Sequence, residues 1–145
     1  MRMISKSSHD CPVIIADADI DFMGHVNNAV YLKWVQAAVI EHWERVASPA
    51  AVAACQWIAL KHEITYRRPA FRLDHLVASV TLEKVRRESA FYDTTIQRCG
   101  EVIAEVKSRW CCIDTVSRQP IRVTPDVIAC FFPRPSADEA AQAWE

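Results

Sequence analysis

The sequence predicts an α+β fold in which one long central helix is wrapped by an antiparallel sheet of about five strands. An apolar pattern with the period of a helix runs from Asn28 to about Val46. Beyond Pro49, apolar and polar residues alternate with the period of two that is typical of strands with one buried face. The 145 residues, of which 51% are hydrophobic, suffice for one domain with a substantial core. We therefore expect a single domain over 1–145, with a core over about 11–132 and a loosely held tail over 133–145.

The first predicted element is a strand from Cys11 to Asp17, because this segment is apolar and β-branched and has Pro12 near its start. The helix that follows is apolar on most of its sides, so we expect other elements to enclose it. The pair Ser48-Pro49 is predicted to end the helix.

Four further strands are predicted after the helix. In the first, alternation places one set of residues on a shared face: Ile58, Leu60, His62, Ile64 and Tyr66. On that apolar face, we expect the histidine to belong to the core or to a pocket wall. Two candidates follow, over about 75–87 and 89–98, and a turn at 99–100 leads to the last strand, over about 102–110. A capping threonine followed by proline predicts a short final helix over 124–131.

Composition and charge exclude several classes of protein. The net charge of −1 offers no strong field for nucleic acid, so we expect no such partner. No apolar stretch is long enough to span a bilayer, and 1–10 lacks the apolar segment of a secretory signal, so we expect a cytoplasmic protein. The five histidines and six cysteines form no metal-binding spacing and no C-x-x-C pair. We therefore expect no metal, and reduced thiols that are mostly buried.

The most informative segment is the loop that precedes the long helix, which reads D-I-D-F-M-G-H-V-N-N over 19–28. Gly24 is one of only two glycines in the chain, and glycine allows a positive φ or a close approach of the backbone to a ligand. The loop also has simpler interpretations. Asp21 is suited to bond its own backbone in a turn, and Asn27 or Asn28 is suited to cap the helix.

A calcium site in this loop is excluded. Asp17, Asp19 and Asp21 alternate as they do at the start of an EF-hand calcium loop. Such a loop requires glycine at its sixth position and glutamate at its twelfth, where this chain has Phe22 and Asn28.

The pattern D-x-D-x-x-G-H-V-N-N-x-x-Y-L resembles the hot-dog-fold acyl-CoA thioesterases of the 4-hydroxybenzoyl-CoA thioesterase type, and the similarity extends from about Val13 to Phe131. The resemblance implies that an acyl-CoA thioester is hydrolysed to a carboxylic acid and coenzyme A, without a cofactor. It implies Asp21 as nucleophile or general base, and the backbone amide of Asn28 at the helix start as oxyanion donor. His25 matches a functional histidine in the related loop of plant acyl-carrier-protein thioesterases, or else holds the loop by a structural hydrogen bond.

The segment V-R-R-E-S-A-F over 85–91 resembles the part of this family where consecutive basic residues meet the phosphates of coenzyme A. The resemblance assigns Arg86, Arg87 and Ser89 to coenzyme A, and arginine suits phosphate through its charged, forked donors. Glu88 stands where some relatives carry a basic residue, so a solvated hairpin end remains the alternative.

Gln36 departs from the family, many of whose members carry a glutamate at this place in the helix. An amide cannot act as a base, so catalysis by a helix glutamate is excluded and the chemistry depends on Asp21. The departure leaves a non-catalytic acyl-CoA-binding or scaffold protein as an alternative, and it argues against a hot-dog dehydratase, the third candidate. The family pairs its sheets edge to edge, so we expect a homodimer or homotetramer with the site between subunits.

Overall fold

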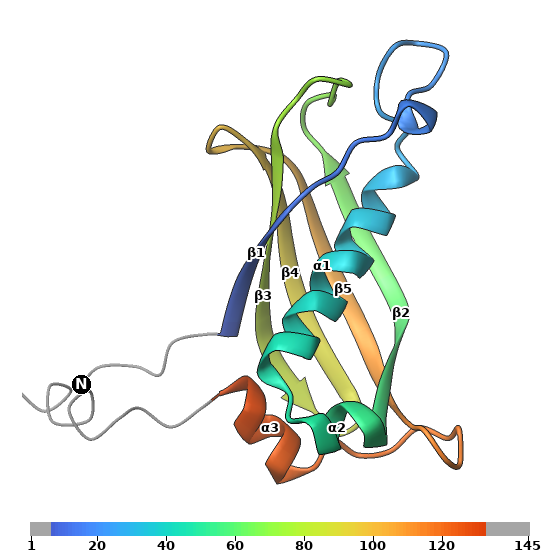
Figure 1. Cartoon of the computed structure of the whole chain (residues 1–145), viewed down its shortest axis with the longest axis vertical. Coiled ribbons are helices and arrows are strands. Elements are labelled where there is room, and N and C mark those ends of the chain that lie inside the picture. The colour runs from blue at the N-terminus through green and yellow to red at the C-terminus, as the bar shows by residue number, and fades with distance from the viewer. Residues whose placement is uncertain (1–6, 133–145) are drawn as a thin grey trace, which may run out of the picture.

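The computed structural model describes residues 7–132, and these form one antiparallel sheet with a long helix along one of its faces (Figure 1). In chain order the elements are β1 (Ser7–Pro12), a short 3-10 helix η1 (Asp17–Asp19), α1 (Val30–Val46), α2 (Pro49–Ala54), β2 (Cys55–Tyr66), β3 (Leu76–Arg86), β4 (Ser89–Arg98), β5 (Glu101–Asp114) and α3 (Pro125–Phe131). The five strands lie in the order β1-β3-β4-β5-β2. The predicted fold class and the hot-dog architecture are confirmed, whereas the expected tail over 133–145 lies outside the described residues.

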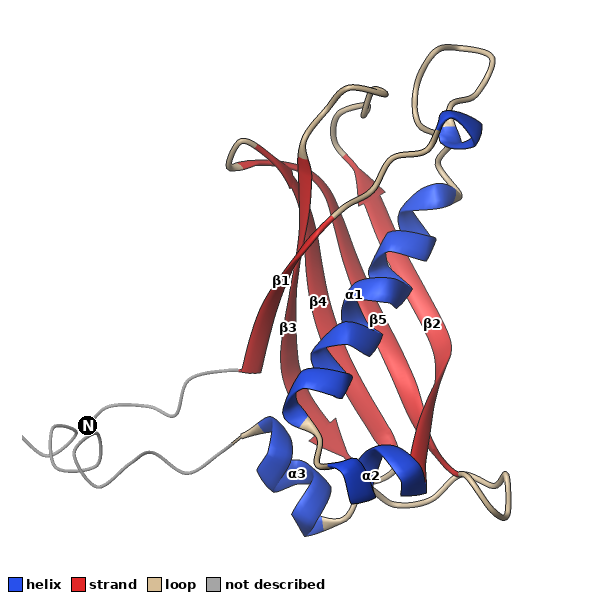
Figure 2. Ribbon diagram, viewed as in Figure 1, coloured by secondary structure: helices blue, strands red, loops and turns tan. Residues whose placement is uncertain are grey.

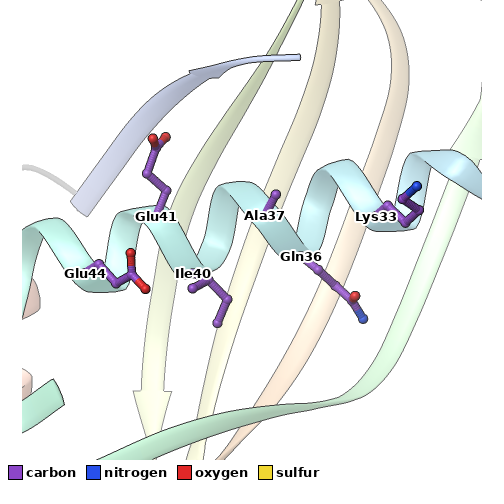
Figure 3. Close-up of a pocket in the computed structure, with 6 residues that line it drawn as sticks. All are labelled: Lys33, Gln36, Ala37, Ile40, Glu41 and Glu44. Carbon is purple, nitrogen blue, oxygen red and sulfur yellow. The ribbon is translucent and has the colours of Figure 1, made fainter. Parts of the chain in front are cut away.

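Helix α1 buries one side and exposes the other. Its buried residues follow the i, i+3, i+4 spacing of a single helix face: Tyr31, Trp34, Val35, Ala38, Val39, His42 and Trp43. Full burial of one large apolar side chain contributes about 1.5–3 kcal/mol, so this face holds the helix on the sheet. The opposite side is open, as Figure 3 shows for Lys33, Gln36, Ala37, Ile40, Glu41 and Glu44. The sheet therefore covers α1 from one side and does not enclose it (Figure 2).

Strand β1 lies earlier in the chain than the predicted strand Cys11 to Asp17. It pairs with β3 along its whole length, although its sequence S-S-H-D-C-P is polar. Two of its inward-facing side chains reach α1: Ser7 Oγ lies 2.7 Å from His42 Nε2, and His9 Nε2 lies 2.6 Å from Glu41 Oε2. These contacts give the polar side chains of β1 hydrogen-bond partners. The hydrophobicity of the segment alone therefore does not predict that it is a strand of the sheet.

Strand β2 contains an irregularity that changes which residues share a face. Its pairing with β5 shifts by one residue at Leu60, which is a β-bulge. The predicted common face is therefore wrong for Ile58 and Leu60, which point outward with 53% exposure each, while His62 and Ile64 are half-buried.

Two short helices begin with a capping hydroxyl. Ser48 Oγ accepts a hydrogen bond from Ala51 N at 3.1 Å, so the predicted helix stop at Ser48 also starts α2, which the sequence reading did not anticipate. At the other, Thr124 Oγ1 accepts from Val127 N at 3.3 Å, and the predicted final helix is confirmed. In the described part of the chain, no helix is long and apolar enough to cross a membrane.

Candidate active site

The loop before α1 is closed by backbone hydrogen bonds at the end of the sheet where α1 begins (Figure 1). Ile20 and Val26 form an isolated antiparallel bridge, and Asp21 N donates to His25 O at 2.8 Å. Gly24 sits at the tip with φ 82°, and its N–H donates to Asp21 O at 3.1 Å. The loop is thus a tight turn, and it requires the positive φ that glycine adopts without strain.

The carboxylate of Asp21 uses one oxygen to hold this loop. Oδ1 accepts hydrogen bonds from Met23 N at 2.9 Å and from His25 N at 3.3 Å. No group between residues 7 and 132 donates to Oδ2. The turn aspartate and the reactive carboxylate are therefore compatible interpretations of one half-buried side chain.

Neither asparagine caps α1, whose N-cap residue is Ala29, and Asn27 instead closes the turn that leads into the helix. Its Oδ1 accepts from Ala29 N at 2.9 Å, and its carbonyl oxygen accepts from Val30 N at 2.9 Å. The N–H of Asn28 has no hydrogen-bond partner among the described residues. This amide lies two residues before a 17-residue helix, at the positive end of the helix dipole, where negative charge is stabilised.

Tyr66, at the end of β2, fixes this helix start to the sheet. Its hydroxyl donates to the carbonyl oxygen of Asn28 at 2.7 Å, and its ring meets Tyr31 edge-on with the centroids 5.1 Å apart. Burial raises the pKa of Tyr66, so the hydroxyl keeps its proton and remains a donor. The sequence reading placed Tyr66 on a strand face but not in the site, because the contact joins residues 38 positions apart.

His25 lies in the same loop, half-buried and edge-on to Phe71 with the ring centroids 5.2 Å apart. Its imidazole makes no hydrogen bond to the part of the chain that the structure describes. In that part of the chain, the side chain of His25 therefore does not hold the loop by a structural hydrogen bond, which was the alternative to a functional role. The residue is connected to the loop through its backbone.

Apolar side chains surround this loop at the surface. Phe22 is 97% exposed, Leu73 85% and Met23 64%. The loop that carries Leu73 is joined to the site loop, because Val26 N donates to Ala70 O at 2.8 Å. Three large apolar side chains are therefore open to solvent on the two loops joined here.

The residues assigned to coenzyme A lie elsewhere. Arg86 and Ser89 pair across the β3–β4 hairpin, and Arg87 stands in its turn with φ 56°. The carbonyl oxygen of Arg87 accepts from Val123 N at 2.9 Å, which places the hairpin beside the segment that leads into α3. In Figure 1 this is the opposite end of the sheet from the loop that carries Asp21. One chain alone does not bring the two groups together.

The arginines of this hairpin are exposed and make no ion pair to the described part of the chain. Three other arginines, near the Asp21 loop, do form ion pairs. Their partners are as follows: Arg67 with Glu105 at 2.7 Å, Arg68 with Glu101 at 3.6 Å, and Arg72 with Asp17 at 2.5 Å.

Two further residues singled out in the sequence lie away from the loop. Gln36 is on the open side of α1 (Figure 3). His62 packs its ring edge-on against Trp110 at 5.8 Å, and burial lowers its pKa, so it is neutral at pH 7. Over residues 7–132, no group of three or more histidine, cysteine or carboxylate side chains is arranged to hold a metal ion. All six cysteines are free thiols, and three of them are buried: Cys55, Cys111 and Cys112.

Comparison with known proteins gives a consistent result. Residues 15–131 match the family model described as the thioesterase-like superfamily. The long-chain acyl-CoA thioesterase FadM of Escherichia coli (strain K12) is 27% identical over 106 residues, which are 70% of this chain and 80% of FadM.

Solved structures share the fold at lower identity. A mutant of 4-hydroxybenzoyl CoA thioesterase complexed with 4-hydroxybenzoyl CoA has a TM-score of 0.78 at 16% identity, covering 86% of this chain and 99% of its own. A thioesterase from Thermus thermophilus complexed with coenzyme A and Zn has a TM-score of 0.74 at 21% identity, covering 84% of this chain and 90% of its own.

Proposed function

Because the chain belongs to the thioesterase-like superfamily, we propose that it is an acyl-CoA thioesterase, which uses water to cleave an acyl-CoA into a carboxylic acid and coenzyme A. The observation that carries the proposal is the backbone amide of Asn28, which has no partner among the described residues and precedes α1 in the same loop as the half-buried carboxylate of Asp21. Thioester hydrolysis needs these two functions, a donor for the oxyanion and a group that attacks or activates water.

In the proposed mechanism, the thioester carbonyl oxygen accepts a hydrogen bond from Asn28 N–H. The positive end of the α1 dipole then stabilises the charge that develops on this oxygen in the transition state. Asp21 Oδ2 either attacks the carbonyl carbon or removes a proton from the attacking water, while Oδ1 keeps the loop in place. In both routes the C–S bond breaks, and coenzyme A leaves as a thiolate that takes up a proton. His25, whose imidazole makes no hydrogen bond to the described residues, is the further candidate for substrate contact. No cofactor takes part.

The two roles of Asp21 give different isotope patterns. In a single turnover in H₂¹⁸O, a general base delivers the ¹⁸O of water directly to the product acid. A nucleophile forms an anhydride first, and hydrolysis of this anhydride at the aspartyl carbonyl leaves ¹⁸O in the protein and ¹⁶O in the product. Mass spectrometry of both species assigns the role.

We propose that the functional unit is a homodimer or homotetramer with subunits joined along β2. Among residues 7–132, the sheet order leaves β2 with one unpaired edge, and Ile58 and Leu60 are exposed on this strand. Antiparallel pairing of two β2 strands about a two-fold axis sets each end of one subunit beside the opposite end of its partner. The end that carries Arg86 and Arg87 in one chain then faces the end that carries Asp21 in the other.

This arrangement supports the assignment of Arg86, Arg87 and Ser89 to the phosphates of coenzyme A, contributed from a neighbouring subunit. Exposed arginines without an ion-pair partner in the described residues keep their donors available for phosphate. We further propose that the protein acts in the cytoplasm, without a nucleic acid or membrane partner.

The test is a thiol-release assay on purified protein with a panel of acyl-CoAs, from short to long aliphatic chains and including aromatic acyl groups. The long-chain substrate in the name of FadM and the aromatic one in that of 4-hydroxybenzoyl CoA thioesterase define the two ends of the panel. Turnover of one class above the others supports the proposal and assigns the acyl group. Tight binding of acyl-CoA without thiol release would instead identify a non-catalytic binding protein. Gln36, which stands where many family members carry a glutamate, is compatible with that alternative.

A further inference from the structure

We propose that Tyr66 is a positioning residue for the oxyanion donor, and this inference rests on the proposed function. Tyr66 ends β2, and its hydroxyl donates to the carbonyl oxygen of Asn28 at 2.7 Å. The bond connects the start of α1 to the sheet at the residue whose N–H has no partner within residues 7–132.

The hydrogen bonds around Asn28 leave its N–H little freedom to turn. The peptide unit between Asn28 and Ala29 is held on both sides, because its N–H donates to Asn27 Oδ1 and its carbonyl oxygen accepts from Tyr66. The peptide unit before it is held through the carbonyl oxygen of Asn27, which accepts from Val30 N at 2.9 Å. The N–H of Asn28 belongs to this second unit, so its direction is set by bonds that do not consume it.

Of the residues that hydrogen-bond to the two peptide units around Asn28, Tyr66 is the one that belongs to a different element. Asn27 and Val30 are neighbours of Asn28 in the chain and move with it, whereas Tyr66 belongs to a strand of twelve residues. Its ring is packed edge-on against the buried ring of Tyr31, with an interplanar angle of 89°. A donor that is fixed before the reaction lowers the reorganisation needed in the transition state, and this is the effect we assign to Tyr66.

The substitution Tyr66→Phe tests this role, since it removes the hydroxyl and keeps the ring. Tyr66 is 39% exposed, so water can solvate the carbonyl oxygen of Asn28 in the variant and the fold persists. We expect kcat to fall about 10-fold at unchanged KM. This is less than the 10²–10³-fold loss that follows removal of an oxyanion donor itself.

Tyr92→Phe is the matched control. It also removes one tyrosine hydroxyl, which lies 2.8 Å from His42 Nδ1 within the core. We expect this variant to unfold at a lower temperature while its kcat stays at the wild-type value. An equal loss of kcat in both variants would show that Tyr66 acts only through general stability, and would overturn the inference.

A second measurement separates this inference from the proposed function. In ¹H–¹⁵N spectra of the whole protein, Tyr66→Phe should shift the amide resonances of Asn28 and Ala29, and Tyr92→Phe should leave them in place. If the wild type releases no thiol from any acyl-CoA, the proposed function fails, and unshifted resonances would then overturn the structural basis of the Tyr66 role. If the wild type is active, an unchanged kcat in Tyr66→Phe, or a change in KM alone, overturns the positioning role of Tyr66.

Discussion

In the loop before α1, two polar groups have no hydrogen-bond partner among the described residues, although the loop is held by hydrogen bonds. Asp21 holds the turn with Oδ1 and leaves Oδ2 without a donor from residues 7–132. Asn27 closes the turn before α1 through Ala29 N and Val30 N, and the N–H of Asn28 has no partner in the same range. A residue type suited to turns or caps is thus no argument against a chemical role. The same side chain can do both when its polar atoms are engaged separately.

Asp21→Asn tests the carboxylate. The amide oxygen can still accept from Met23 N, so we expect the loop to persist, while kcat falls roughly 10²-fold or more because the reactive charge is lost. Substrate binding should be largely retained. Steady-state kinetics and a binding measurement on the same preparation separate the two effects.

The control is Asp17→Asn, the same change at an exposed carboxylate at the same end of the molecule, which pairs only with Arg72 among the described residues. It should leave kcat unchanged. Near wild-type hydrolysis by Asp21→Asn would show that the site is wrongly assigned.

The paired substitutions Arg86→Ala and Arg87→Asn test coenzyme A binding. Asparagine is chosen at the second position because Arg87 has φ 56°, a conformation that alanine adopts only with strain. We expect KM for acyl-CoA to rise more than kcat falls, since phosphate contacts are made equally in the ground and transition states. A truncated acyl thioester without the nucleotide is the control substrate. Equal losses on both substrates would limit these arginines to a structural role.

The sequence predicts candidate site residues that share one loop, and it gives no sign of Tyr66, which reaches this loop from another element. Asp21, His25 and Asn28 lie within eight consecutive positions, so a motif captures them. Tyr66 contacts Asn28 only because β2 ends beside the start of α1, and the chain pattern does not encode that register. In the same way, no local signal reveals that the hairpin of Arg86 lies at the far end of the sheet.

At the scale of elements, β1 and α1 are joined by buried polar contacts rather than by apolar ones alone. His42 lies between Ser7 Oγ, 2.7 Å from its Nε2, and Tyr92 OH, 2.8 Å from its Nδ1. Burial, and to a lesser degree His9, lowers the pKa of His42 to about 4. The imidazole is therefore neutral in the folded protein at pH 7, and it must lose its hydration to enter the core.

We expect this histidine to make stability depend on pH. The unfolded chain binds the proton near pH 6.5 and the folded chain only near pH 4, so the unfolded state gains protons first as the pH falls. The His42 contribution is fully present above about pH 6.5 and is lost as the pH falls toward 4. It is on the order of 3 kcal/mol. Urea unfolding at pH values from 7.5 to 4.5 measures it.

The double variant His42→Phe with Tyr92→Phe provides the control. Replacing His42 and Tyr92 by apolar rings leaves no unsatisfied hydroxyl between these two positions. Ser7 loses its histidine partner, but it is only half-buried and can be solvated, so the variant should fold and its stability should vary much less over this pH range. His9 and Glu41, which form a neighbouring pair, remain in both proteins and cancel in the comparison. An unchanged pH dependence in the double variant would assign the effect to other groups.

Helices and strands were predicted well where buried residues recur at a regular spacing in the sequence. They were predicted poorly where burial depends on contacts with residues far away in the chain. The helical period predicts the extent of α1, and alternating hydrophobicity predicts where the four later strands lie along the chain. Neither pattern gives the order of the strands in the sheet. The polar strand β1 is placed in the sheet by partners on α1 more than 30 positions away. The bulge at Leu60 depends on pairing with β5, and it reverses the face of Ile58 although the sequence alternates without interruption.

At the scale of the whole molecule, the sheet has two edges of unequal length. The β1 edge has six residues, whereas β2 has twelve and exposes Ile58 and Leu60. Long edges with exposed apolar residues invite pairing with another chain. The separation of Asp21 from Arg86 within one chain also favours an oligomer, because the proposed site needs both residues and one chain does not bring them together.

Joint substitution of Ile58→Glu and Leu60→Glu tests this assembly. Two charges on each β2 strand would meet like charges across the proposed two-fold axis, so we expect the oligomer to dissociate and acyl-CoA hydrolysis to be lost with it. The matched control is Val52→Glu with Val116→Glu, which places the same charges on exposed aliphatic residues outside β2 and should change neither property. Light scattering and activity are followed together across a dilution series of each protein. Because the proposed site needs residues from two subunits, activity should fall at the concentration where the oligomer dissociates, and a fully active monomer would contradict both the interface and the shared site.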